Sequence, residues 1–287
     1  MRKRRLKRLK DLHQGRPPIV KYSPTISSKA TRAIIRRHHT LQKQRNKSLA
    51  EGDIINAVDL TNQIEHDGGI ELYQRASLLG QSRERGGDSS KVMLNWLQPL
   101  FSKLEVSNST SKVRILEIGA LSDSNACSNS KLFEVERIDL NSQSENIKQQ
   151  DFMERPTPRQ DNEKFDIISL SLVLNFVPDA AGRGNMLKRI SNFLRTSKNL
   201  DTEQDIFPCL FLVLPASCIT NSRYMDEARL DEIMTNLGYV CVHKKLSKKL
   251  VYYLWHLRTL KPAPNAFRKK EIRSGKTRNN FSIVINL

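Results

Sequence analysis

Residues 113–128 read VRILEIGALSDSNACS, an apolar run that leads into a carboxylate and then a glycine. Residues 113–118 have the apolar, β-branched character of a buried strand. Gly119 follows where such a strand ends, and glycine lacks the Cβ that keeps a ligand away from the backbone. Glycine is also scarce in this chain, with 12 in 287 residues. We therefore expect a ligand to lie against the turn at Gly119.

Downstream of a short serine-rich stretch at 107–111, strand-like and helix-like runs alternate. The strand-like runs are VRILEI (113–118), FEVERIDL (133–140), QQDFM (149–153), FDIISLSLVL (165–174), IFPCLFLVLP (206–215), YVCVHKKL (239–246) and LVYYLWHL (250–257). Helix-like stretches lie near 182–195 and 223–237. This alternation predicts an α/β fold with a doubly wound, seven-stranded, mostly parallel sheet. Only a few residues separate the last two strands, so we expect them to form an antiparallel pair at one edge, as in class I methyltransferases.

The part of the chain before this sheet is expected to be helical. Apolar residues recur at roughly helical spacing from 31 to 62, and two further helical pieces flank a break at 85–87. Asp88 is a suitable N-cap for the second piece. The predicted segments are a basic disordered tail (1–30), a helical module (31–106), a class I methyltransferase domain (107–260) and a basic C-terminal segment (261–287).

The net charge of +18 is concentrated at the two ends of the chain. Residues 1–50 carry a net charge of +15 and residues 243–287 carry +11, whereas the part between them carries −8. Basic ends of this kind favour a polyanion, above all a nucleic acid, as partner. The alternatives are a solvated tail that only directs targeting and a membrane surface, although the first 50 residues lack the aromatic face of an interfacial helix.

Other classes of protein are disfavoured by what the sequence does not contain. No run approaches the roughly 20 apolar residues that span a bilayer. The opening MRKRRLKRLK is not followed by the apolar region of a secretory signal, and it fits a nuclear or nucleolar address better. The four cysteines form no CxxC motif, so neither a metal site nor a disulfide framework is expected.

Carboxylates stand at or near the ends of three consecutive predicted strands. Glu117 lies just before Gly119 and is placed to accept hydrogen bonds from an ammonium group. Asp139 ends the second strand, twenty residues after Gly119, where a carboxylate takes the hydroxyls of a ribose. Asp151 and Phe152 end the third strand, where the acid accepts from an adenine amine and the ring covers the base. These residues predict a nucleoside ligand.

The turn has only one glycine and therefore is not the G-x-G-x-x-G fingerprint that a pyrophosphate requires. A ligand with a ribose, an adenine and a charged amino-acid end but no phosphate fits the remaining features, and S-adenosylmethionine is such a ligand. The alternative is an ordinary strand and turn with surface acids.

The fourth strand is expected to carry the reacting side of the site. In its FDIISLSLVLNFVPD sequence, Asn175 and Phe176 follow the apolar run. An amide can hold the edge of a base, and an aromatic ring can stack on a base drawn out of its helix. The alternative is a loop with a buried phenylalanine and a capping asparagine. The six histidines are dispersed, and no arrangement for nucleophilic catalysis competes with this site.

Five motifs, in this order, resemble the fungal 25S ribosomal-RNA adenine-N(1) methyltransferase family over roughly residues 70–260. They are GQSRERGGDSSKVMLNWL, LEIGALSDSNACS, ERIDLNS, QQDFM and SLVLNFVPDAAGRG. The resemblance implies a class I fold, S-adenosylmethionine as donor, and methylation of one adenine N1 in large-subunit rRNA or a preribosome, in the nucleus and nucleolus. It places Gly119 at the methionine side of the donor, Asp139 at the ribose, and Asp151 and Phe152 at the adenine.

A metazoan branch of the same family shares these motifs, yet it serves as an S-adenosylmethionine sensor in the TOR pathway. A non-catalytic sensor with a protein partner is therefore the first alternative, and a methyltransferase with a different acceptor is the second. Arg85, in the RERGGDSSK stretch of both branches, is a candidate clamp for the donor carboxylate. Its alternative is a surface arginine in a turn between helices. Adenine N1 has a free lone pair, so we expect no essential general base.

Overall fold

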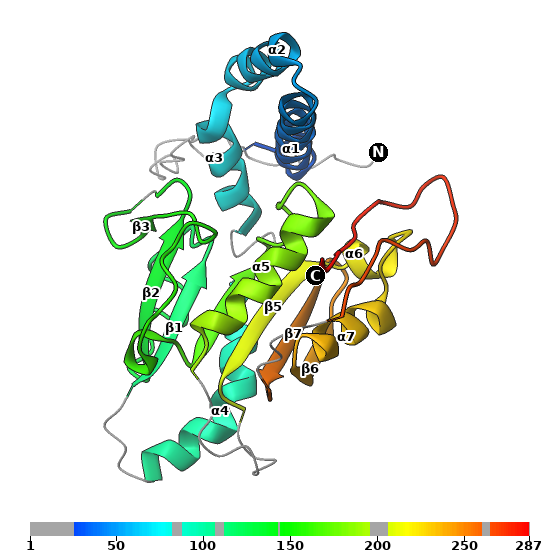
Figure 1. The fold of residues 1–287 in the computed structure, drawn as a ribbon. Coiled ribbons are helices and arrows are strands. Elements are labelled where there is room, and N and C mark those ends of the chain that lie inside the picture. Colours follow the sequence, from blue (N-terminus) through cyan, green and yellow to red (C-terminus); the bar gives the residue numbers. More distant parts are fainter. Residues whose placement is uncertain are drawn as a thin grey trace, which may run out of the picture.

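The computed structural model describes residues 26–81, 88–106, 112–142, 144–195, 206–259 and 265–286. Figure 1 shows a sheet with α5 crossing one face and the helices α1–α3 grouped beyond one end. Most of the tail predicted to be disordered lies outside the described residues. Within those ranges, no helix is both long and apolar enough to cross a membrane.

The sheet has seven strands in the order β3-β2-β1-β4-β5-β7-β6. The strands are β1 (Val113–Ile118), β2 (Phe133–Asp139), β3 (Lys148–Gln149), β4 (Ile167–Ser171), β5 (Cys209–Pro215), β6 (Tyr239–Leu246) and β7 (Leu250–Leu257). Strands β1 to β5 pair in parallel, while β7 is antiparallel to both β5 and β6. This confirms the predicted class I sheet with its antiparallel edge.

The third strand is shorter than predicted. After Gln149 the chain leaves the sheet, and the Gln150 N–H makes a last bond of 2.9 Å to the Asp139 carbonyl. Asp151 Oδ1 then accepts a hydrogen bond of 2.7 Å from the Met153 N–H. A carboxylate bonded to the backbone two residues on forms a turn, which explains why pairing stops there.

The helices are α1 (Ser28–Ala50), α2 (Ile54–His66), α3 (Gly69–Gln81), α4 (Ser90–Val106), α5 (Ala180–Phe193), α6 (Ser217–Thr220) and α7 (Glu227–Asn236), with a 3₁₀ turn at Asp161–Glu163. The helical run predicted over 31–62 is two helices rather than one. Gly52 adopts φ +75° and Asp53 caps α2 by accepting from the Asn56 N–H at 3.1 Å. A left-handed glycine followed by an N-cap ends one helix and starts the next.

Apolar side chains cover both faces of the sheet. On one face, strand residues pack with α5, α7 and the C-terminal residues Phe281, Ile283 and Ile285. On the other face they pack with Met93 and Leu97 of α4. Helix α4 therefore packs against the sheet, whereas α1 and α2 share a small separate core of Leu41, Leu60 and Ile64. From here on, helical module means α1–α3.

The C-terminal segment is part of the α/β core rather than only a basic tail. The Val284 N–H donates to the Ala180 carbonyl at 2.9 Å, and Gly184 leaves so little room that a Cβ there would lie 1.8 Å from the Val284 oxygen. Buried Arg183 donates to the Ser282 carbonyl at 2.8 Å and lies over the Phe281 ring. The chain thus returns across α5 to complete the core.

Candidate active site

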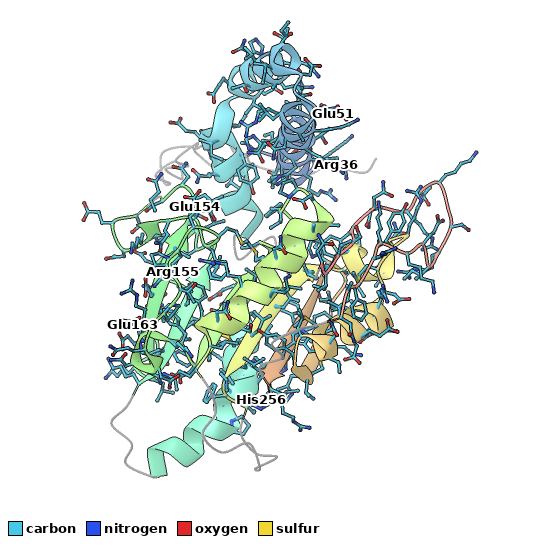
Figure 2. The ribbon with its side chains drawn as sticks, in the orientation of Figure 1. Arg36, Glu51, Glu154, Arg155, Glu163 and His256 are labelled. Atoms are coloured by element: carbon cyan, nitrogen blue, oxygen red, sulfur yellow. The ribbon has the colours of Figure 1, made fainter. Side chains whose placement is uncertain are left out.

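The predicted site residues gather at the carboxyl ends of β1, β2 and β4. Strand β1 lies between β2 and β4, so the chain order reverses there. In open α/β sheets, ligands bind in the crevice at such a switch point. Figure 1 shows the helical module beyond this end of the sheet. His256, labelled in Figure 2, lies at the opposite end, and its Nδ1 is 3.1 Å from the Ile206 carbonyl.

Gly119 is the residue on which the turn after β1 depends. Its φ is +75°, and an added Cβ would lie 2.3 Å from Val173 Cγ2 in the loop after β4. Its N–H donates to the Ile138 carbonyl at 2.8 Å, which joins the turn to the end of β2. The left-handed backbone and the contact with Val173 both require glycine.

Glu117 lies beneath this turn and is held by one amide. Both of its carboxylate oxygens are 2.9 Å from Asn125 Nδ2. Burial raises the pKa of Glu117 and the nearby Asp88 carboxylate adds to this, while the Asn125 bond and the Arg137 charge oppose the rise. Glu117 therefore helps to shape the turn in addition to its predicted role toward an ammonium group.

The start of α4 crosses the same end of the sheet. Asp88 Oδ2 accepts from the Ala126 N–H at 2.6 Å, and its Oδ1 accepts from the Ser90 hydroxyl at 2.6 Å. Ser89 Oγ lies 2.9 Å from Ser171 Oγ at the end of β4. Sequence reasoning gave Asp88 only a capping role and missed this bridge, although DSS is part of the RERGGDSSK motif. Arg85, the candidate carboxylate clamp, lies outside the described residues.

Asp139 is half-buried at the end of β2, as its ribose-binding role requires. Its Oδ1 accepts from the Asn141 N–H at 2.8 Å. Burial raises the pKa of Asp139, and the Asn141 bond opposes this rise. Asn141 in turn donates from Nδ2 to Gln74 Oε1 at 2.7 Å and accepts on its carbonyl from Gln74 Nε2 at 2.7 Å. The helical module therefore supports the turn that carries Asp139.

The two residues predicted at the adenine end are placed differently. Asp151 is half-buried. It lies beside the end of β2, since the adjacent Gln150 N–H donates to the Asp139 carbonyl. Phe152 is only 2% exposed, and its ring packs 5.0 Å from that of Phe193 in the core. The structure therefore places the Phe152 ring in the core, and its contact with the adenine stays a prediction.

The loop after β4 brings Asn175 and Phe176 to the same end of the sheet. It begins at Leu172, a non-glycine residue with φ +59°. Such a backbone is costly for a leucine, and strain of this kind concentrates at functional sites. The Oδ1 atom of Asn175 is buried and has no hydrogen-bond partner among the described residues. Phe176 stacks on His39 of α1, a neighbour that sequence reasoning did not anticipate.

This set of residues offers hydrogen-bond acceptors and close backbone approach, but not a metal site. Within the part of the chain that the structure describes, no three His, Cys, Asp or Glu side chains gather as metal ligands would. The half-buried Asp139 and the unpaired Asn175 oxygen flank the Gly119 turn from β2 and β4. The arrangement fits a nucleoside on one side of the turn and a polar planar acceptor on the other.

Comparisons with known proteins identify the family of this chain. The family described as 25S rRNA (adenine(2142)-N(1))-methyltransferase, Bmt2, matches residues 58–283. The 25S rRNA adenine-N(1) methyltransferase of Schizosaccharomyces pombe is 41% identical over 252 residues, 87% of this chain and 89% of that protein. The 25S rRNA (adenine(2142)-N(1))-methyltransferase of Saccharomyces cerevisiae is 40% identical over 255 residues, 87% of this chain and 71% of that protein.

A comparison of folds adds one solved structure, the N-methyltransferase NodS from Bradyrhizobium japonicum with S-adenosyl-l-homocysteine. It is 14% identical, its TM-score is 0.36, and the match covers 56% of this chain and 87% of that one. This likeness is too slight to bear on function, and the fold assignment rests on the strand order. The sequence matches are far stronger and extend over most of the chain. The chain belongs to the 25S rRNA (adenine(2142)-N(1))-methyltransferase family.

Proposed function

We propose that this protein transfers a methyl group from S-adenosylmethionine to N1 of an adenine in large-subunit rRNA. The observation that carries the proposal is the turn at Gly119, which has φ +75° and lies against Val173. The Gly119 N–H bonds to the Ile138 carbonyl, and this bond joins the turn to the end of β2, where Asp139 lies. Family membership gives the reaction, and the geometry of this turn supports a donor site at the Gly119 end of the sheet.

The residues present fit the donor. Asp139, half-buried and bonded on one oxygen to the Asn141 N–H, keeps acceptor capacity for the ribose hydroxyls. Gly119 lets the methionine part approach the backbone, and Asp151 is available for the adenine amine. Glu117 and Asn125 hold the floor of the turn. When bound, the donor supplies an electrophilic methyl group on a sulfonium.

On the acceptor side, the protein has to position a base rather than deprotonate it. Adenine N1 carries a lone pair, so its alignment with the methyl group supplies most of what the reaction needs. N1 faces the Watson–Crick partner in a duplex, and the base must be single-stranded or flipped out. The unpaired Asn175 Oδ1 would accept from the exocyclic amine of the adenine, and Phe176 would stack on its ring.

The basic regions would bind the RNA backbone. Exposed arginines and lysines on α1 and in the C-terminal segment, including Arg36 in Figure 2, carry charge near the carboxyl ends of the strands. Binding to rRNA should therefore weaken steeply as salt rises, because phosphate contacts release counterions. A flat response to salt would remove this role. The substrate would be the rRNA or a preribosome, in the nucleus and nucleolus, which a fluorescent fusion of the full chain tests.

The sensor alternative finds no support in these comparisons, since the matching relatives are named as methyltransferases. A decisive test is transfer of labelled methyl groups to unmodified 25S rRNA, followed by chromatography of the nucleosides. Label is expected in 1-methyladenosine, and it should be lost in Asp139→Ala but retained in Asp59→Ala, an exposed acid on α2. Donor binding without labelled RNA would favour the sensor. Label in another nucleoside would indicate a different acceptor.

A further inference from the structure

Aromatic rings join the helical module to the acceptor side of the site. The His39 ring of α1 stacks on Phe176, with centroids 4.3 Å apart and planes 18° apart. Tyr73 of α3 meets both rings edge-on, at 5.0 Å from His39 and 6.1 Å from Phe176. His38 stacks on Tyr73 at 4.6 Å. One face of Phe176, the ring assigned to the target base, is therefore occupied by the protein itself.

A base cannot share that face with His39. The His39 ring, with its centroid 4.3 Å from that of Phe176, already lies where a base stacked on this face would lie. The imidazole has to leave before a base can stack there.

Polar atoms beside the His39–Phe176 stack indicate which kind of ligand could bind there. The Nε2 atom of His39 and the Oδ1 atom of Asn175 are both buried, and neither has a hydrogen-bond partner among the described residues. Buried polar atoms are nearly always bonded, so two unpaired ones beside one ring favour a planar ligand with polar edges. Burial, with a smaller contribution from His38, lowers the pKa of His39 to about 4. The neutral ring is a flat heterocycle, as a nucleobase is.

We propose that His39 occupies the place of the target adenine on Phe176 in the RNA-free protein, and that the incoming base displaces it. This inference rests on the proposed function and adds to it a residue of the helical module that selects the base. The adenine ring replaces the lost His39 stack with its own stack on Phe176. Its amine also donates a hydrogen bond to Asn175 Oδ1, which has no partner while His39 is in place. A base without that amine replaces only the stack and does not gain the hydrogen bond to Asn175.

The test compares binding of fluorescein-labelled hexa-adenylate RNA with an abasic oligonucleotide of the same length, by anisotropy in saturating S-adenosylhomocysteine. His39→Ala should bind hexa-adenylate about two- to tenfold more tightly, the value of one aromatic stack. The abasic oligonucleotide should bind equally to both proteins. His39→Gln, which keeps polar atoms but has no ring, should change binding in the same direction. His66→Ala, exposed on α2, should not change it.

A double-mutant cycle links the gain to the stack, because Phe176→Leu should abolish the effect of His39→Ala. Calorimetry with S-adenosylhomocysteine identifies folded variants, and His39→Gln decides if His39→Ala does not fold. Weaker binding in His39→Ala would make His39 a wall of the base pocket, and unchanged binding would make the contact irrelevant; either result overturns the proposal. Methyl transfer by the unaltered protein is measured separately, so failure of the proposed function is distinguishable.

Discussion

Gln74 of α3 and Asn141, two residues beyond the end of β2, exchange two hydrogen bonds of 2.7 Å each. Asn141 also donates its N–H to Asp139, so one short turn connects the helical module to the carboxylate assigned to the ribose. Gln74 is buried, and its amide has little alternative access to water. The module therefore supports the proposed donor side of the site through Asn141, and it contacts the proposed acceptor side through Phe176.

Gln74→Ala should weaken both the fold and the donor site. The change leaves the Asn141 carbonyl and side chain without these partners, which lowers the free energy of unfolding by about 1–3 kcal/mol. It should also weaken S-adenosylhomocysteine binding, because the Asp139 turn loses its support. Urea unfolding and calorimetry measure the two effects. Gln63→Ala, exposed on α2, is the control and should alter neither. Unchanged donor affinity in a destabilised Gln74→Ala protein would show that the link serves stability alone.

Gly119→Ala should abolish measurable donor binding. The new methyl group would meet Val173 at 2.3 Å, and alanine would be strained by the left-handed backbone at this position. Gly52→Ala is the matched control, since Gly52 has the same φ of +75° but nothing within 4 Å of its Cβ position. That control should lose only about 1 kcal/mol of stability and keep its donor affinity. If both variants bound S-adenosylhomocysteine alike, the close approach at Gly119 would have no role in the site.

Asn175→Ala should separate donor binding from transfer. The proposed contact is with the acceptor base, so donor affinity by calorimetry should stay at its normal value. Methyl transfer to 25S rRNA should fall about ten- to hundredfold, as expected for one lost hydrogen bond of the stronger kind. Asn185→Ala, exposed on α5, provides a control with normal transfer. A loss of donor affinity in Asn175→Ala would move this residue to the donor pocket.

Acid should destabilise the protein partly through His39. Its pKa is lowered to about 4 in the folded state, against an ordinary 6.5. The unfolded chain therefore binds more protons, and the free energy of unfolding falls as the pH falls from 6.5 toward 4. Between pH 7 and pH 5 this one group contributes a loss of order 2 kcal/mol.

Urea unfolding of His39→Gln at these two pH values isolates that contribution. The variant should lose less stability on acidification than the unaltered protein does. His66→Gln, which replaces an exposed histidine, is the control and should lose as much stability between the two pH values as the unaltered protein does. An identical dependence in His39→Gln and the unaltered protein would contradict the assignment.

The sheet and the positions of Gly119 and Asp139 at strand ends were predictable because their signals are local. The strand at Val113–Ile118, the glycine after it and Asp139 at the next strand end each follow from a few neighbouring residues. The partners of these residues were not predictable in the same way. Gln74 lies 67 residues from Asn141, and Asp88 lies 38 residues from Ala126. Pairing across such distances depends on how the module meets the sheet, which no local pattern encodes.

Phe152 and Phe176 show that the sequence does not reveal which of two similar rings is buried. Both are phenylalanines beyond strand ends in the sequence, yet one is buried in the core and the other stacks on His39 at the edge of the module. The residue type is the same, and only the course of the following loop decides which ring is enclosed. A similar limit applies to residues 281–285, whose apolar pattern is too short to reveal that it covers α5.

The segment at 281–285 that covers α5 is synthesised late. Arg183 and its partner Ser282 are 99 residues apart in the chain, so α5 is made well before the segment that seals its apolar face. Until then the face of α5 at Gly184 is open to water, and contacts of such long range form slowly. Incomplete chains that stop before residue 281 should therefore be the species most in need of a chaperone.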